Sequence, residues 1–405
     1  MPVVNDREKF LNIETIIFDM DGVVTSESEY WNAADLTVLE LLYGGQFVGL
    51  NNETFQTIMV KPGAPVTLSH FVSEDFIAYL KNSGINTNWD LAYFSFALYL
   101  IDLIVSAGPR DKVAAVLDEP FSAGTLREIG RLIPGRNMLL EKIDGNSAYF
   151  KSFRNRRMKQ KPLRETSAEP QKRAERFVED INDWRYERTG LAKPVFQRSG
   201  PMWDLVVALF QQRYLGDRLY ERDNGPAPSE IHKDGMIQFE EPVIPAGKII
   251  SAMAMLKEAG LRLGIATGRP YDEIIEPLRR WGLHHFFESD RIATHREIAE
   301  AEKWMAGNRK HESISKPHPY VYLKSLYPEK GIEELIDMKL PFPDDAGKKI
   351  LIVGDSLSDI MAARKMNTCA AIVLTGIKSL EAVEQMKALD PEFVLTDVSK
   401  IEKLF

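Results

Sequence analysis

The stretch Thr15-Ile16-Ile17-Phe18-Asp19-Met20-Asp21-Gly22 decides the fold, because it changes from apolar to acidic at a single point. Its first four residues are mostly apolar and rich in β-branched side chains, which predicts a fully buried strand ending in a polar loop. The same pattern recurs in the last third of the chain. Three further apolar runs that end at polar or glycine residues span 261–266 (LRLGIA), 348–353 (KKILIV) and 370–374 (AAIVL).

Helical patterns separate these predicted strands. Apolar residues recur at helical spacing over 246–259, 271–281 and 359–366. Strands that alternate with helices predict an α/β fold with a parallel sheet covered by helices on both faces. In such a sheet, ligands bind beyond the carboxyl ends of the strands, because loops and helix amino termini converge there. We therefore expect the polar residues that follow the strands to form the functional site.

The alternation of strands and helices disappears between residues 25 and 245. Aromatic and aliphatic residues recur there at helical spacing, with proline and glycine between the runs. We interpret this region as a mainly α-helical domain inserted after the first strand, which divides the chain into core (1–25), insertion (26–244) and core (245–405). The helices expected in the insertion span 30–43, 71–80, 89–105, 173–185 and 203–219.

Composition excludes several classes of protein. A chain of 405 residues exceeds what one compact core usually holds, and its 44% hydrophobic residues exclude a disordered chain. A net charge of −8 opposes general attraction to nucleic acid or to an anionic membrane, so neither is an expected partner. Segment 151–174 carries nine basic and two acidic residues. We interpret it as a solvated loop, with a patch for an anionic substrate or for nucleic acid as alternatives.

The cysteine content and the amino terminus indicate a cytoplasmic protein. The single cysteine, Cys369, cannot form an internal disulfide, which is typical of a reducing compartment. Residues 1–9 are charged and are not followed by the apolar segment of a secretory signal. The most apolar run, 91–101 (LAYFSFALYLI), falls short of the roughly 20 residues that span a bilayer. We expect it to form a buried helix.

The first loop carries two carboxylates, Asp19 and Asp21, at a point where Gly22 permits unusual backbone angles. A carboxylate can attack a phosphorus or carbon centre when a second group handles the proton of the leaving group. Asp355 follows another predicted strand, and Asp359 lies on the opening turn of the next helix. Four converging carboxylates need a cation, and an all-oxygen site of this kind suits Mg²⁺.

Groups that favour an anionic substrate lie elsewhere in the last third of the chain. Lys316 can add positive charge near the nucleophile. Thr267 and the amide of Gly268 can donate hydrogen bonds to the same substrate oxygens. Arg269 can reach a substrate anion or can instead pair with Glu273 on the following helix, and the sequence leaves both interpretations open.

Four stretches of the chain, taken in order, resemble the haloacid dehalogenase superfamily of hydrolases. They are 16–23 (IIFDMDGV), 265–269 (IATGR), 316–319 (KPHP) and 352–359 (IVGDSLSD). The resemblance implies a Rossmann-like core and Mg²⁺-dependent phosphoryl transfer. The Lys-Pro-x-Pro form of the third stretch is similar to the branch that contains β-phosphoglucomutase, phosphoglycolate phosphatase and phosphonatase. An insertion between the first two stretches is similar to the helical cap of that branch.

The resemblance also implies a role for each catalytic residue. Asp19 is expected to be the nucleophile that forms an aspartyl phosphate. Asp21 is expected to be the general acid that protonates the leaving oxygen, and then the base that activates water. Thr267 and Lys316 are expected to hold the phosphoryl group, with Gly268 and Arg269 completing the predicted substrate-binding set.

The same resemblance implies a magnesium site. Asp19, Asp355 and the backbone carbonyl of Asp21 are expected to be its ligands. Asp359 is expected either to ligate the metal through water or to orient Lys316.

The leading functional hypothesis is a phosphatase that acts on a small phosphorylated metabolite. Carbon–halogen cleavage needs neither a general acid nor a metal, so Asp21 together with Asp355 favours phosphate chemistry. A phosphomutase and a noncatalytic binding protein are the alternatives. An insertion of some 220 residues is far larger than the usual helical cap of this branch, so the resemblance does not identify the substrate. The sequence leaves open whether the protein is a monomer or a homodimer.

Overall fold

The computed structural model divides the chain into two compact units, each described by itself. Unit 1 comprises Met1–Glu27 and Ile237–Phe405, and unit 2 comprises Ser28–Met236. The boundaries predicted from the sequence are 25/26 and 244/245. The structure describes residues 12–51, 55, 71–72, 76–77, 79–80, 85, 87–135, 151–156, 170–308, 313–377 and 380–405.

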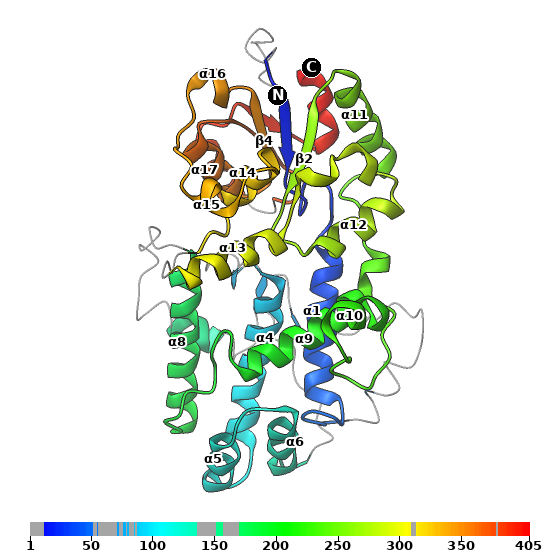
Figure 1. Cartoon of the computed structure of the whole chain (residues 1–405). Coiled ribbons are helices and arrows are strands. Elements are labelled where there is room, and N and C mark those ends of the chain that lie inside the picture. The colour runs from blue at the N-terminus through cyan, green and yellow to red at the C-terminus, as the bar shows by residue number, and fades with distance from the viewer. Residues whose placement is uncertain are drawn as a thin grey trace. The chain divides into compact units, whose positions relative to one another are not determined.

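Unit 1 contains a six-stranded parallel sheet with the strand order β3-β2-β1-β4-β5-β6. The first strand of the chain is therefore central, and its two neighbours come from the second half of the sequence (Figure 1). The strands are β1 (Thr15–Phe18), β2 (Arg262–Ala266), β3 (Ile292–Ala293), β4 (Ile350–Gly354), β5 (Cys369–Val373) and β6 (Phe393–Leu395). This arrangement confirms the predicted α/β class and parallel sheet.

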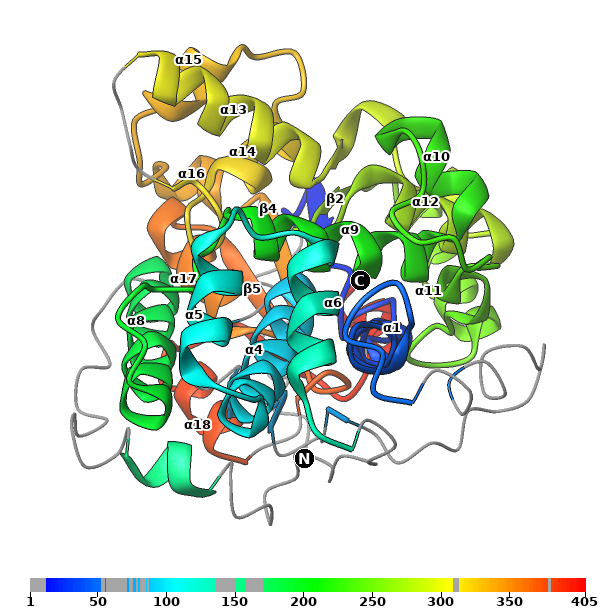
Figure 2. The same cartoon turned by 90° about the horizontal axis from the view of Figure 1, so that it is seen from below.

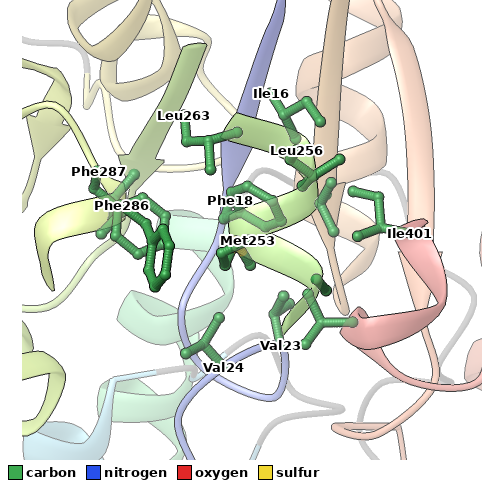
Figure 3. Packing of buried hydrophobic residues seen from close by; sticks show 14 of the residues in the cluster. Ile16, Phe18, Val23, Val24, Met253, Leu256, Leu263, Phe286, Phe287 and Ile401 are labelled. Atoms are coloured by element: carbon green, nitrogen blue, oxygen red, sulfur yellow. The ribbon is translucent and has the colours of Figure 1, made fainter. Parts of the chain in front are cut away.

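Alternating residues of each strand face opposite layers of helices, because successive side chains of a strand point to opposite faces. Ile16 and Phe18 pack with Met253 and Leu256 of α11 (Ala246–Glu258), as Figure 3 shows. Ile17, between them, belongs to the core on the other face. Burial on both faces explains why the strands consist of continuous apolar runs rather than of alternating polar and apolar residues.

The remaining helices of unit 1 cover the two faces of the sheet. The first face is completed by α12 (Tyr271–Arg280) and the 3₁₀ helix η5 (Val398–Leu404), and the second by α14 (Tyr320–Leu326) and α17 (Leu357–Met366). Figure 1 shows α11 and α14 on opposite sides of the strands. The other elements are α13 (His295–Gly307), α15 (Ile332–Ile336), α16 (Asp344–Gly347), α18 (Leu380–Lys387), η2 (Met236–Phe239), η3 (His284–Phe286) and η4 (Ser289–Arg291).

The named secondary-structure elements among the described residues of unit 2 are all helices, as the sequence predicts. Helix α4 (Asn88–Ser106) occupies its centre and packs against α1, α6, α8 and α9 (Figure 2). The other helices of unit 2 are α1 (Ser28–Tyr43), α5 (Arg110–Asp118), α6 (Ala123–Leu132), α8 (Pro170–Thr189), α9 (Pro201–Leu215) and α10 (Asp217–Asn224).

Helix α4 contains the most apolar run of the chain. It is the one helix among the described residues that is long and apolar enough to cross a membrane, with a mean hydropathy of 1.4 over its best window. Of that window, 78% is buried within the protein, which is typical of a core helix of a soluble protein. The expected buried helix is therefore confirmed, although at 19 residues it is longer than the run that predicts it.

One predicted helix of unit 2 is wrong in its continuity. The apolar spacing over 203–219 predicts a single helix, but α9 ends at Leu215 and α10 begins at Asp217. Gly216 separates them with φ of +80°, a backbone angle that ends a helix and that side chains rarely allow. A Cβ at this position would lie 2.5 Å from the carbonyl oxygen of Asp234, so the close approach of another segment also requires glycine.

Two other expectations fall partly outside the described residues. Within the predicted helix over 71–80, residues 76, 77, 79 and 80 are helical and residues 71 and 72 are not, while the other four lie outside the described residues. The middle of the basic segment, 157–169, also lies outside them. Where the basic segment is described, Arg156 forms two hydrogen bonds of 2.7 Å with the carboxylate of Glu187.

A buried group of charges joins three segments of unit 2. Glu40 of α1 is fully buried and forms ion pairs with Arg213 of α9 and with Lys233, whose Nζ lies 3.1 Å from Oε1. The hydroxyl of Ser229 donates to the same carboxylate. Burial alone would raise the pKa of Glu40, but Arg213 and Lys233 bring it below its usual range. Burial also lowers the pKa of Lys233, to about 8. We call Glu40, Arg213 and Lys233 the buried charge triad.

Candidate active site

Asp19 lies at the carboxyl end of the central strand. Phe18 pairs with Ile265 of β2 on one side and with Val353 of β4 on the other. The backbone N–H of Asp19 donates to the carbonyl oxygen of Val353 at 2.8 Å, which extends the pairing by one residue. The strand register therefore places Asp19 level with Ala266 and Gly354, the last residues of β2 and β4, and so next to the residues that follow these strands.

Asp355, the residue after β4, lies between two glycines. A Cβ on Gly22 would lie 2.0 Å from Oδ2 of Asp355, and a Cβ on Gly376 would lie 1.8 Å from the same atom. Neither position can carry a side chain while the carboxylate keeps its place. The hydroxyl of Thr375 donates to the carbonyl oxygen of Gly22 at 2.5 Å, which ties the two glycine-containing loops together.

The carboxylates of Asp19, Asp355 and Asp359 converge at the carboxyl ends of the central strands β1 and β4. Each offers one oxygen, and these oxygens lie within 4.8 Å of one another. A set of hard oxygen donors of this kind suits Mg²⁺. The side chain of Asp21 is not in this group, and its expected contribution through the backbone carbonyl stays a prediction.

Lys316 bridges two of these carboxylates. Its Nζ lies 2.8 Å from Oδ1 of Asp19 and 2.9 Å from Oδ1 of Asp359, and its side chain is only 13% exposed. The ring of Tyr322 lies beside the ammonium group, with its centroid 5.1 Å from Nζ. Burial alone would lower the pKa of Lys316, but Asp19 and Asp359 raise it above its usual range. Lys316 therefore carries its positive charge next to Asp19.

Asp359 is fully buried, and both of its oxygens accept hydrogen bonds. Its Oδ1 accepts from Lys316 and from the hydroxyl of Tyr322. Its Oδ2 accepts from the hydroxyl and the backbone N–H of Ser356, at 2.6 and 3.1 Å, in a capping box at the start of α17. Burial alone would raise the pKa of Asp359, but Lys316, Ser356 and Tyr322 lower it. These contacts favour the expectation that Asp359 orients Lys316.

The environment of Asp19 differs from that of Asp359. Burial raises the pKa of Asp19 above its usual value, and the nearby carboxylates of Asp359 and Asp21 raise it further, while Lys316 opposes the shift. Clustered acidic groups of this kind are stabilised when a cation enters. The raised pKa of Asp19 and the convergence of carboxylate oxygens therefore both suit a site that binds a cation.

Thr267 and Gly268 follow β2, next to the site. Thr267 is fully buried, its backbone N–H donates to Ala293, and its hydroxyl oxygen accepts from the backbone N–H of Arg269 at 3.2 Å. Gly268 is exposed, and a Cβ there would meet nothing within 4 Å. Helix α12 begins only at Tyr271, so the amide of Gly268 lies before its first turn. The predicted contacts of both residues with a phosphoryl group stay predictions.

Arg269 is directed toward Asp21. Its Nε donates to Oδ1 of Asp21 at 2.7 Å, and its Nη1 donates to Glu240 at 2.6 Å. The side chain of Arg269 is 3% exposed, and that of Glu240 is fully buried. The predicted contact of Arg269 with substrate stays a prediction, since the structure describes its contacts with carboxylates of the protein.

The comparison with protein families agrees with this geometry. The model of the haloacid dehalogenase-like hydrolase family matches residues 13–367. The chain belongs to this family. The match confirms the family resemblance inferred from the four sequence stretches, and it confirms that the protein is a hydrolase of this superfamily.

Curated relatives of this haloacid dehalogenase-like hydrolase are named as pyrophosphatases. Pyrophosphatase PpaX of Listeria monocytogenes serotype 4a (strain HCC23) is 24% identical over 226 residues, covering 49% of this chain and 87% of the relative. Pyrophosphatase PpaX of Listeria innocua serovar 6a is similar to the same extent. An X-ray structure from the Northeast Structural Genomics Consortium is 26% identical, with a TM-score of 0.74, covering 97% of this chain and 98% of that one. The structural likeness confirms the predicted fold.

Four residues that shape the site of this hydrolase are not among the residues predicted from its sequence. They are Tyr322, which contacts Lys316 and Asp359, Gly376, which lies against Asp355, Ser356, which caps α17, and Glu240, which pairs with Arg269. The sequence does contain a signal for Gly376. Thr375-Gly376 directly follows the predicted strand over 370–374, just as polar residues follow the other predicted strands. Ser356 also fits the pattern Ser-x-x-Asp of a helix start.

Proposed function

We propose that this hydrolase is a Mg²⁺-dependent phosphatase that releases phosphate from a small phosphorylated metabolite through an aspartyl phosphate. The observation that carries the proposal is the contact of Lys316 with Asp19, beside the carboxylates of Asp355 and Asp359. A buried carboxylate at the carboxyl end of a parallel strand can attack a phosphoryl group. The neighbouring cation can neutralise the negative charge of that group.

The reaction that we propose has two steps. A carboxylate oxygen of Asp19 attacks the phosphorus of a phosphate monoester, and the bond from phosphorus to the ester oxygen breaks. The departing alcohol takes its proton from Asp21. In the second step Asp21 accepts a proton from water, whose oxygen attacks the same phosphorus, so that inorganic phosphate leaves and the carboxylate of Asp19 is restored. Lys316 and Thr267 hold the phosphoryl oxygens in both steps.

The residues present fit the proposed metal. Asp19, Asp355 and the backbone carbonyl of Asp21 would hold Mg²⁺, and the convergence of carboxylate oxygens supports this assignment. When bound, the ion neutralises negative charge on the transferring phosphoryl group. Asp359 would act by orienting Lys316, as its contacts favour.

The substrate of this hydrolase is proposed only by class. The relatives named pyrophosphatase make inorganic diphosphate one member of that class to test, beside sugar and nucleoside phosphates. A phosphomutase would use the same residues but would return the phosphoryl group from Asp19 to an isomeric acceptor. We propose that unit 2 corresponds to the helical cap of the family and selects the substrate, and that the protein acts in the cytoplasm.

The proposal is tested by measuring phosphate release from a panel of phosphorylated metabolites, diphosphate included, with Mg²⁺ or with EDTA. We expect release that depends on Mg²⁺ and is lost in EDTA, because the clustered carboxylates need the ion. A product that is an isomer of the substrate, without free phosphate, would indicate the phosphomutase. Absence of both reactions across the panel would contradict the proposal and favour a binding protein.

Replacing Gly376 by alanine is expected to weaken the binding of Mg²⁺ at the proposed site. The new Cβ would collide with Oδ2 of Asp355 and displace the carboxylate. Changes next to metal ligands typically cost about 10- to 100-fold in metal affinity or activity. We expect a rise of that size in the Mg²⁺ concentration that gives half-maximal activity, measured by titration at saturating substrate. The matched control is Gly247→Ala in α11, where a Cβ would meet nothing within 4 Å. An unchanged Mg²⁺ titration for Gly376→Ala would contradict the assignment of Asp355.

A further inference from the structure

Arg269 joins three parts of unit 1 that are far apart in the sequence. Its Nε and Nη2 both donate to Oδ1 of Asp21, its Nη2 also donates to the carbonyl oxygen of Ser26 at 3.1 Å, and its Nη1 donates to Glu240 at 2.6 Å. The side chain of Arg269 is only 3% exposed. Its planar set of donors allows it to hold several acceptors in fixed directions at once.

Two of these partners flank the places where the chain passes between the units. The chain leaves unit 1 after Glu27 and returns to it at Ile237, so Ser26 belongs to the outgoing segment and Glu240 to the returning one. The two segments are also bonded directly to each other. The N–H of Ser26 donates to the carbonyl oxygen of Glu241 at 3.1 Å. Arg269 therefore contacts both connecting segments as well as Asp21.

The backbone of Arg269 is held on both sides. Its N–H donates to the hydroxyl oxygen of Thr267, and its carbonyl oxygen accepts from the N–H of His295 at 2.9 Å. A guanidinium that is buried and anchored at its base can fix the position of a carboxylate more firmly than a flexible surface cation. The negative charge of Glu240 balances the positive charge of Arg269. This pairing matters because a buried charge without a partner is energetically costly.

We propose that Arg269, with Glu240 as its counter-charge, is a positioning residue that fixes the carboxyl group of Asp21 relative to the two connecting segments. The inference rests on the proposed function, in which Asp21 gives a proton to the leaving oxygen. Arg269 acts through Asp21 and is distinct in this role from a residue that contacts substrate. The contacts of Arg269 with Asp21 use Oδ1, which leaves the other oxygen, Oδ2, for the proposed proton transfer.

This role has a specific kinetic consequence. An alkoxide is a poor leaving group and needs the proton from Asp21, whereas a nitrophenolate departs without one. The ratio kcat/KM reports the steps up to the first irreversible one, here the loss of the leaving group, and so excludes the later hydrolysis of the aspartyl phosphate. A misplaced Asp21 should therefore reduce kcat/KM for alkyl phosphates far more than for activated aryl phosphates.

The experiment compares benzyl phosphate with para-nitrophenyl phosphate, two monoesters of similar shape, in the wild-type protein and in Arg269→Gln. General acid catalysis contributes about 10²- to 10⁴-fold, and misplacement by about 1 Å can cost 10²-fold. We expect the ratio of kcat/KM for benzyl phosphate to that for para-nitrophenyl phosphate to fall by about 100-fold. Arg269→Lys keeps the charge but not the planar set of donors, and we expect an intermediate fall.

A matched control is Arg280→Gln. Arg280 donates to the carbonyl oxygens of Ile237 and Glu240, so it holds the same returning segment while its described contacts do not include Asp21. We expect its ratio to equal that of the wild-type protein. If Arg269→Gln does not fold, as judged by circular dichroism, Arg269→Lys and Glu240→Gln carry the test.

The outcomes separate this inference from the proposed function. Equal losses for both substrates in the Arg269 variants, or the same change of ratio in Arg280→Gln, would overturn the positioning role while leaving the phosphatase proposal intact. No phosphate release by the wild-type protein from either monoester would instead count against the proposed function. A fall in the ratio confined to the variants of Arg269 and Glu240 would support the inference.

Discussion

Replacing Asp19 by asparagine is expected to reduce phosphate release by at least about 10³-fold, because removing a catalytic nucleophile costs rates of this order or more. The amide keeps the shape of the side chain but cannot attack phosphorus to form an acyl phosphate. It also removes the charge that pairs with Lys316 at 2.8 Å. The loss should therefore appear for every substrate that the wild-type protein accepts, with either an aryl or an alkyl leaving group.

The intermediate itself can be detected. Borohydride reduces an acyl phosphate to an alcohol, so wild-type protein quenched during turnover should contain homoserine at position 19 by peptide mass spectrometry. Asp19→Asn should contain none. Asp345→Asn, on an exposed face of α16, is the control and should retain wild-type activity. Activity of Asp19→Asn above about a tenth of wild type would assign the nucleophile to another residue.

Replacing Glu40 by glutamine is expected to destabilise unit 2 by about 3 kcal/mol. Breaking a buried ion pair by removing one partner typically costs about 3 to 5 kcal/mol, because the other charge stays buried without compensation. In the buried charge triad, Arg213 and Lys233 would both lose their shared carboxylate. We choose the lower end of that range because Asp217 also attracts Lys233.

Urea unfolding followed by tryptophan fluorescence measures this loss. Unit 2 contains four of the six tryptophans, Trp31, Trp89, Trp184 and Trp203. The double variant Glu40→Gln with Lys233→Met should recover part of the stability, because it removes one of the two stranded cations. Glu230→Gln, an exposed change, should lie within about 0.5 kcal/mol of wild type. A loss below about 1 kcal/mol for Glu40→Gln would contradict the importance of the triad.

The contribution of Glu40 to folding stability should also depend on pH, in a direction set by the shift of its pKa. The folded-state pKa of Glu40 lies below the ordinary value of 4.5, so the ionised carboxylate stabilises the folded state above about that pH. As the pH falls through the folded-state pKa, protonation removes this contribution. The difference in stability between the wild-type protein and Glu40→Gln should therefore be full at neutral pH and shrink below pH 4.5.

The central strands of unit 1 are predictable from sequence because they are buried on both faces. Residues 15–18 predict a strand, and β1 has those bounds. Strands β3 and β6 are not predicted, because two and three residues are too short to show a pattern. Both lie at the edges of the sheet. Val394 of β6 is 40% exposed, so β6 also lacks the continuous burial of the inner strands, whereas both residues of β3 are buried.

The candidate site is predictable where its residues follow a strand directly. Asp19, Thr267 and Asp355 are of this kind, because a polar residue after an apolar run is visible in the sequence itself. The contact of Tyr322 with Asp359 is not, since it depends on how α14 and α17 pack on one face of the sheet. The contact of Arg269 with Asp21 and Glu240 likewise joins three distant segments, and no local pattern indicates it.

The central position of β1 has a consequence for how the protein is made. The ribosome produces β1 first, but its partner β4 begins only at Ile350, after unit 2 and β2. At about 5 to 20 residues per second, the interval between the two is roughly 20 to 70 s. Throughout that time an apolar strand destined for the middle of a sheet lacks at least one neighbour, and exposed strand edges promote aggregation. Unit 2 is continuous in sequence, so its chain is complete long before the sheet is. The newly synthesised chain must therefore keep its amino-terminal strand soluble until nearly the whole protein has emerged.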